Sequence, residues 1–215
     1  MSAVLAKETE DFVRQRAKRS LLEHIKLVHD YEPPHHQLQA ITILEDLSIN
    51  RLVIIWPPKY GKTPLVGLDY LGWRIGNNHN HHVIYVSNTA TQAYKPSVAL
   101  RDTIVLNPVY KWLYRIEPDM NKGWSENEWF VKRENIADKD PTLQSCGVHG
   151  PLLGATVEEV IFDDIADVEN QATAYQREKL IEWIRNVPLS RLVPKQNRVV
   201  LICTRWHEED PAAIF

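Results

Sequence analysis

The 215-residue chain has only two cysteines and no long apolar run. Cys146 and Cys203 are far apart and match no metal-ligand spacing, so we expect two buried, reduced thiols and no disulfide framework. No apolar run reaches the length that spans a bilayer, and no signal-peptide pattern opens the chain. These absences favour a globular protein of a reducing compartment, without a membrane span.

The chain also lacks an excess of basic residues. It has 25 Lys and Arg against 28 Asp and Glu, a formal net charge of −3. Since no global positive field surrounds the protein, any contact with DNA must use a local patch of cations. The nine histidines form no H-E-x-x-H or Cys/His cluster, and His79-Asn-His-His82 is interpreted as a polar turn. We therefore expect no structural metal.

The most informative segment is Trp56-Pro57-Pro58-Lys59-Tyr60-Gly61-Lys62-Thr63. It follows the β-branched run 51–55 and precedes helical apolar spacing over 65–75. A strand, a tight loop with Gly-Lys-Thr and a helix are the context of a phosphate-binding P-loop. The backbone N–H groups of such a loop and the helix N-terminus attract a polyphosphate.

In that reading Lys62 reaches the β- and γ-phosphates and Thr63 holds Mg²⁺. The motif departs from the usual form at Trp56, where a P-loop has its first glycine. The alternative interpretation is a Pro-Pro turn followed by a capped helix.

Short apolar runs separated by helical patterns predict an α/β fold, a mostly parallel sheet with helices on both faces. The strands are expected at 51–55, 83–86, 159–162 and 198–203. The helices are expected at 3–29 with a break near Ser20, at 37–48, from Thr89 to about 105 with a start or kink at Pro96, and at 173–186. Residues 31–36 are interpreted as an extended linker, 107–150 as short strands packed on the sheet edge, and 147–154 as a loop.

Polar residues follow three of the expected strands. Lys62, Asp163-Asp164 and Thr204-Arg205 each lie just past a strand's end, and the carboxyl ends of parallel strands collect ligand-binding residues. Asp163 is expected to hold a metal ion, and Asp164 to orient and polarise the attacking water. The alternative for this pair is a solvated acidic turn.

Four segments resemble motifs of tailed-phage terminase large subunits. Residues 57–63 resemble their variant Walker A motif, and Val160–Asp164 resembles their Walker B motif. Leu201–Asp210 is similar to the segment that carries their coupling motif, and its Thr-Arg-Trp-His-Glu string is the most specific piece. Pro33–Gln37 resembles the region that contacts adenine. The resemblance runs from about residue 30 to the end of the chain.

The resemblance implies a P-loop NTPase domain of the ASCE type at 31–215, after a helical appendage at 1–30. It implies an ATP-driven motor that packages double-stranded DNA into a procapsid, with ATP and Mg²⁺ as cofactors. Carried over to this sequence, the phosphate loop includes Pro58, Lys59, Tyr60, Gly61, Lys62 and Thr63, with Lys59 near the γ-phosphate. Thr63 and Asp163 carry over to the metal, Asp164 to the catalytic carboxylate, Thr204 and Arg205 to coupling, and Gln37 and Tyr31 to the adenine side.

The implied partners are the portal protein, the small terminase subunit and further copies in a ring, usually of five. The implied place is the cytoplasm of an infected bacterium and, transiently, the procapsid. The family continues past the position of Phe215 into a nuclease, and no acidic nuclease cluster is recognisable here, so a fragment without the nuclease domain is expected.

Two departures from the family pattern leave roles open. Many terminases have Glu where this chain has Asp164. A loop residue that is often Arg is Ala155 here, so no arginine finger is assigned; Arg101 and Arg191 are alternatives, each otherwise a surface or ion-pair residue. Two further functions stay open: a helicase-like, DNA-stimulated P-loop ATPase, and a nucleotide-binding fragment that does not hydrolyse. Trp112, Trp124, Trp129 and Trp206 are interpreted as core residues.

Overall fold

A six-stranded sheet forms the centre of the computed structural model, which describes residues 3–152 and 154–215. The strand order is β1-β6-β5-β2-β4-β3, and only the pairing of β3 with β4 is antiparallel. The strands are β1 (Arg51–Ile55), β2 (Val83–Ser87), β3 (Glu128–Trp129), β4 (Leu143–Gly147), β5 (Glu159–Asp163) and β6 (Arg198–Cys203). The register pairs Ile55 with Cys203 and Asp163 with Ile202, so β1, β6 and β5 end at the same edge of the sheet.

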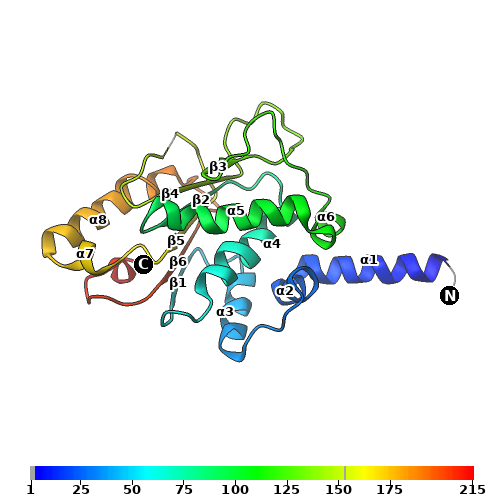
Figure 1. Ribbon diagram of the computed structural model, residues 1–215, viewed down its shortest axis with the longest axis horizontal. Coiled ribbons are helices and arrows are strands. Elements are labelled where there is room, and N and C mark those ends of the chain that lie inside the picture. The colour runs from blue at the N-terminus through cyan, green and yellow to red at the C-terminus, as the bar shows by residue number, and fades with distance from the viewer. Residues whose placement is uncertain (1–2, 153) are drawn as a thin grey trace.

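Helices cover both faces of this sheet (Figure 1). One face packs against a group of helices: α2 (Leu21–His29), α3 (His35–Glu45), α4 (Leu71–Asn77), α5 (Ala90–Leu106) and α6 (Pro108–Tyr114). The other face packs against α8 (Ala174–Asn186), which follows the short α7 (Val168–Gln171). Strands β2, β4, β5 and β6 are buried along their whole length, as continuous apolar runs in a covered parallel sheet require.

The N-terminal segment forms two helices, as predicted. α1 (Ala3–Arg19) projects from one end of the molecule in Figure 1, and Ser20 ends it by accepting a hydrogen bond from Glu23 N as the N-cap of α2. α2 shares the main core, where Leu21 and Ile25 are fully buried. Within the described residues, no helix has the length and apolar content needed to cross a membrane.

The helix after the P-loop opens with an unusual turn. Residues Pro64–Tyr70 form a π-helix that runs directly into α4. Proline at the first helical position loses no hydrogen bond, because its N–H would be unpaired there in any case. Single π-turns inside helices occur frequently at functional sites. Pro96, by contrast, lies within the continuous helix α5 and neither starts nor ends it.

The prediction for 107–150 was partly wrong. The segment interpreted as an edge excursion contains α6 and β4, and β4 is an internal strand that pairs in parallel with β2. Asn107-Pro108 has the appearance of a turn in the sequence, yet Asn107 accepts a hydrogen bond from Tyr110 N and so caps the helix. Residues 1–2 and 153, which fall in the expected appendage and loop, lie outside the described residues.

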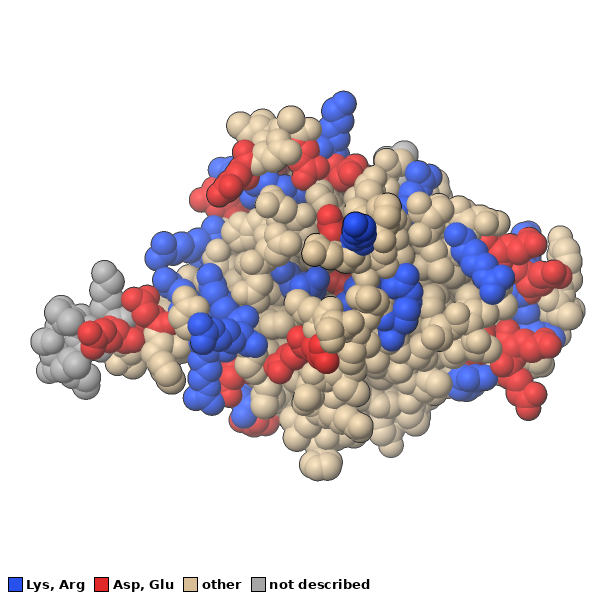
Figure 2. Space-filling view, turned by 180° about the vertical axis from the view of Figure 1, so that it is seen from behind, with Lys and Arg blue, Asp and Glu red and all other residues tan. Residues whose placement is uncertain are grey.

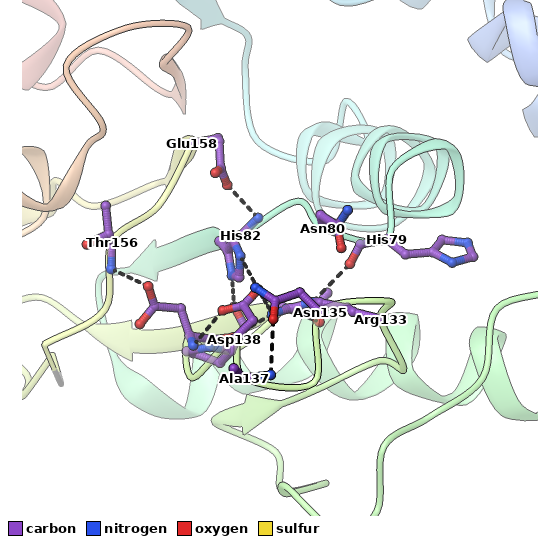
Figure 3. A network of polar contacts seen from close by, with 12 residues as sticks. His79, Asn80, His82, Arg133, Asn135, Ala137, Asp138, Thr156 and Glu158 are labelled. Atoms are coloured by element: carbon purple, nitrogen blue, oxygen red, sulfur yellow. Dashed lines mark hydrogen bonds and ion pairs between the residues drawn. The ribbon is translucent and has the colours of Figure 1, made fainter.

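Two other interpretations are corrected. The polar turn expected over 79–82 is present at 79–80, but His81 and His82 are buried: His81 pairs with Glu159 at 2.7 Å and His82 with Asp138 at 3.1 Å (Figure 3 shows the His82 side). Trp206 is 48% exposed and not a core residue. The other predictions of this kind are confirmed: both cysteines are free and buried, Trp129 is fully buried, and Trp112 and Trp124 pack against the main core.

Glu159 carries a charge at the buried start of β5. Tyr70 donates to it at 2.5 Å, His81 Nε2 lies 2.7 Å away, and Arg74 Nε lies 3.3 Å away. Burial would raise the pKa of Glu159, but the hydrogen bond and charge of His81 and the charge of Arg74 outweigh it and lower the pKa from 4.5 to about 2. A buried carboxylate is tolerated here only because both of its oxygens have hydrogen-bonding or charged partners.

We predict that Glu159→Gln lowers the free energy of unfolding by about 3–5 kcal/mol at pH 7, as expected when one partner of a buried ion cluster is removed. Because the folded-state pKa is depressed, this contribution is present above pH 4.5 and is lost as the pH falls toward 2. The measurement is urea unfolding of wild type and variant at pH 7 and pH 3. Glu158→Gln is the matched control, and equal destabilisation by both variants would contradict the account.

Candidate nucleotide-binding site

The loop between β1 and the π-helix has the backbone of a phosphate cradle. Lys59 and Gly61 both have positive φ angles, 69° and 76°. A Cβ at Gly61 would lie 2.5 Å from Gln37 Nε2, so a side chain here would displace Gln37 and would add strain at the positive φ. Gln37 Nε2 donates to the Tyr60 carbonyl at 3.1 Å, and His36 Nε2 lies 3.1 Å from the same oxygen. The start of α3 therefore fixes the shape of the loop.

Lys62 lies inside this loop and is only 5% exposed. Its Nζ donates to the carbonyl of Trp56 at 3.0 Å and to that of Pro57 at 3.4 Å. It also donates to Thr204 Oγ1 at 2.9 Å and lies 3.3 Å from Asp164 Oδ2. The ammonium group thus joins the P-loop to the ends of β5 and β6.

Asp163, the last residue of β5, contacts the P-loop from the other side. Its Oδ2 accepts hydrogen bonds from Thr63 Oγ1 and Tyr85 OH, each at 2.6 Å, while Ser87 Oγ donates to its carbonyl at 2.9 Å. Its Oδ1 is buried and has no hydrogen-bond partner. Burial raises the pKa of Asp163, the hydrogen bonds from Thr63 and Tyr85 oppose the rise, and the charge of Asp164 adds to it.

Asp164 has a different environment, although it is the next residue. Its φ of 45° turns the chain sharply away from β5, a conformation that Asp tolerates better than most residues. The side chain is 45% exposed, and its Oδ1 accepts a hydrogen bond from Thr204 N at 3.0 Å. One carboxylate of the pair is therefore buried against the P-loop, and the other faces solvent beside Lys62.

The structure thus brings together Lys62, Thr63, Asp163, Asp164 and Thr204. The remaining predicted residues lie as follows. Pro58, Lys59 and Tyr60 are exposed on the loop. Arg205 turns into its own loop, where Nε lies 3.2 Å from Asp210 Oδ2 and Nη2 donates to two carbonyls, those of His207 and Glu208. Arg101 donates to the Trp124 carbonyl, and Arg191 lies beside Gly154.

The two adenine-side candidates differ. Gln37 is 5% exposed, and its Oε1 is buried without a hydrogen-bond partner. The Tyr31 hydroxyl instead donates a hydrogen bond, 2.5 Å long, to Oδ2 of Asp69, which is a residue of the π-helix. Gln37 is therefore the candidate with an unused acceptor.

Sequence reasoning did not identify His36, Tyr85 and Ser87. The His36 ring lies 5.3 Å from that of Trp56 and 5.0 Å from that of Tyr60, measured between centroids, so an aromatic group stands where a P-loop has its first glycine. Tyr85 and Ser87 alternate along β2, and Ser87 pairs with Asp163 in the sheet. Side chains two residues apart on a strand point to the same face, so the spacing of Tyr85 and Ser87 in β2 could have identified them as a pair.

The residues present fit a nucleotide with a divalent cation. The orphaned Asp163 Oδ1 and the Thr63 hydroxyl are hard oxygen donors of the kind that Mg²⁺ takes with phosphate oxygens. A cation at Oδ1 would also reverse the raised pKa of Asp163. In the described part of the chain, no group of three or more His, Cys, Asp or Glu side chains could hold a metal ion by itself. A divalent cation at this site would need the phosphate oxygens of the nucleotide as further ligands.

Fold and site together define an α/β P-loop domain of the ASCE type. Neither a family model nor a curated protein matches the chain. Among solved structures, the HK97 bacteriophage large terminase matches with a TM-score of 0.62 and 14% identity, over 93% of this chain and 40% of that one. The large terminase ATPase domain of Thermus phage P74-26 matches with a TM-score of 0.51 and 15% identity, over 85% and 68%.

The chain thus has the fold of large terminase ATPase domains, as the resemblance in its motifs implied. It spans about 40% of the length of the HK97 protein.

We predict that Asp69→Asn changes how stability depends on pH. Burial raises the pKa of Asp69 from 3.8 to about 7, with the Tyr31 hydrogen bond opposing the rise. Because the folded-state pKa is raised, the stability contributed by the neutral acid is present below pH 3.8 and is lost as the pH rises through 7. Wild type should therefore lose stability relative to the variant between pH 4.5 and pH 8, measured by urea unfolding. The exposed Asp102→Asn serves as the control, and parallel curves for wild type and Asp69→Asn would refute the prediction.

Proposed function

We propose that this chain is the ATPase motor domain of a viral terminase large subunit, and that ATP hydrolysis at this site drives packaging of double-stranded DNA into a procapsid. The observation that carries the proposal is the contact of Lys62, from the P-loop, with Thr204 at the end of β6 and Asp164 after β5. The fold shared with terminase ATPase domains supports it.

ATP binding would use groups that have no better partner within the protein. Besides its ion pair with the half-exposed Asp164, Lys62 is held by neutral carbonyl oxygens and a hydroxyl, which are weaker partners for an ammonium than phosphate oxygens. The unpaired Gln37 Oε1 suits a donor such as the adenine amino group. Thr63 and Asp163 would hold Mg²⁺, which supplies charge neutralisation at the phosphates.

Hydrolysis would rest on Asp164. Its half-exposed carboxylate is open to water, and the Thr204 backbone N–H fixes one of its oxygens. A carboxylate held in this way can accept a proton from the attacking water. The buried Asp163 cannot serve as well, because Oδ2 already accepts two hydrogen bonds and Oδ1 would be used by the metal.

Coupling would begin at Thr204. Its hydroxyl contacts Lys62 and donates to the Trp56 carbonyl at 3.2 Å, while its N–H contacts Asp164. The loop that follows is tied to itself by Arg205 and Asp210, and Glu209 pairs with Arg177 of α8 at 3.0 Å. A change at the phosphates would therefore reach the helix on the far face through this loop.

The wider assignment follows from the same proposal. The partners would be double-stranded DNA, the portal protein, the small terminase subunit and further copies in a ring of five. The place of action would be the cytoplasm of an infected bacterium and the procapsid. Residues 31–215 would form the ATPase domain after the helical arm 1–30, and Lys59, exposed on the loop, would approach the γ-phosphate. The isolated domain would turn ATP over slowly.

We predict that Lys62→Ala abolishes measurable ATP binding, because no other buried cation contacts the loop carbonyls among the described residues. Equilibrium binding of a fluorescent ATP analogue measures this. Lys195→Ala, an exposed lysine in the loop before β6, is the control and should bind as wild type does. Normal binding by Lys62→Ala would remove the basis of the assignment.

We predict that Asp164→Asn keeps ATP affinity and loses at least ~10²-fold in hydrolysis rate, as expected for a positioned general base. The measurement is Mg²⁺-dependent phosphate release with and without duplex DNA. Loss of binding together with turnover would make Asp164 a metal ligand instead. ATP binding by wild type without turnover under any condition would select the non-hydrolysing alternative, and strand separation of a tailed duplex would select the helicase-like one.

A further inference from the structure

A polar groove lies away from the nucleotide site. It has a volume of about 560 Å³, and its lining includes Lys18, Asn77, His79, Tyr114, Lys132 and Arg133. Residues 76–80 precede β2, so the groove lies at the amino edge of the sheet, whereas the P-loop lies at the carboxyl edge. The continuous helical segment from Pro64 to Asn77 runs from the P-loop to the groove.

Two cations around this groove, Lys18 and Arg115, lack counter-charges among the described residues. Burial, and then the charges of Arg14 and Arg115, lower the pKa of Lys18, so the three cations repel one another. Within the described chain neither Lys18 nor Arg115 forms an ion pair, and the nearest carboxylate to Arg14 is Asp11, at 3.8 Å. Figure 2 shows Lys and Arg side chains gathered where α1 meets the body of the molecule.

The acidic groups nearby do not cancel this excess. Glu134 lines the groove, and Glu117 pairs with Lys132 at 2.7 Å, both of them well exposed. Helix C-termini attract cations, which accounts for basic residues in the last turn of α1. It does not account for Arg115, which follows another helix and lies close enough to Lys18 to lower its pKa. The local sign is positive on a chain whose net charge is −3.

One wall of the groove is rigid. Arg133 has a side chain only 2% exposed; its Nε donates to the His79 carbonyl at 3.0 Å, and its Nη1 lies 2.7 Å from Asp138 Oδ2. Asp138 in turn pairs with His82 at 3.1 Å. Figure 3 shows the His79 ring pointing away from this network. This wall of the groove is thus preformed, which reduces the entropy cost of binding there.

We propose that this groove, with Lys18 and Arg115 as its free cations, binds the phosphodiester backbone of double-stranded DNA. Lysine, arginine and amide side chains are the usual partners of backbone phosphates, and Asn77, Asn78 and Asn80 add amides to the cations. An acidic peptide is the less suitable occupant, because the lining is mainly polar and offers few apolar anchors. The choice of DNA as the polyanion rests on the proposed function.

The test is the binding of a fluorescently labelled, mixed-sequence duplex to the full chain without nucleotide, by anisotropy over a series of salt concentrations. The variant Lys18→Gln/Arg115→Asn removes the two free cations, and Asn suits the left-handed backbone at 115. Its affinity should fall about tenfold or more, and the slope of log affinity against log salt should decrease by about 2. The matched control Arg185→Gln/Lys195→Gln removes the same charge from exposed sites elsewhere and should bind as wild type does.

Equal losses in both double variants would overturn the proposal, because binding would then follow net charge alone. Absence of duplex binding by wild type would also overturn it, and polyglutamate binding in its place would assign the groove to an acidic protein. The ATPase activity of each variant is measured in parallel and should be unchanged. The two proposals can fail separately. If wild type shows no ATPase activity but binds the duplex, and the groove variant loses that binding, the proposed function is contradicted and the groove assignment stands.

Discussion

The buried ammonium group of Lys62 is the interaction on which the candidate site depends. A charge that is only 5% exposed requires compensation, and its partners come from three separate parts of the chain. The carbonyls of Trp56 and Pro57 belong to the P-loop, Thr204 follows β6, and Asp164 follows β5. These parts meet only because β1, β6 and β5 lie side by side in parallel and end in register.

The two sheet edges carry different chemistry. The carboxyl edge holds the loop, the two aspartates and Thr204, while the amino edge holds the buried Glu159 cluster and the cationic groove. One helical segment, from Pro64 to Asn77, joins the two edges and begins with a π-turn. Tyr70 of that segment donates to Glu159, and Asp69 accepts from Tyr31, so the segment is anchored by polar contacts along its length. Under the proposed function, this segment would link the phosphate site to the groove that binds the polyanion.

The sequence was sufficient where the structure depends on local pattern. Continuous apolar runs predicted four strands, and the strand, tight loop and helix predicted around Gly-Lys-Thr are all present. β4 was misplaced because Gln144 and Ser145 make it look like a surface strand, although both are buried. His81 was misread because its partner Glu159 lies 78 residues away, and the Lys62–Thr204 contact spans 142 residues. Such contacts are fixed by strand order, which spacing in one sequence does not reveal.

The most direct test is a crystal structure of the chain with a non-hydrolysable ATP analogue and Mg²⁺. The account predicts that Lys62 Nζ leaves the carbonyls of Trp56 and Pro57 for a phosphate oxygen, and that Asp163 Oδ1 gains a partner through the metal. Thr204 should then shift, because it loses its contact with Lys62. A bound analogue with the Lys62, Thr204 and Asp164 contacts unchanged, or an analogue bound away from the loop, would contradict the account.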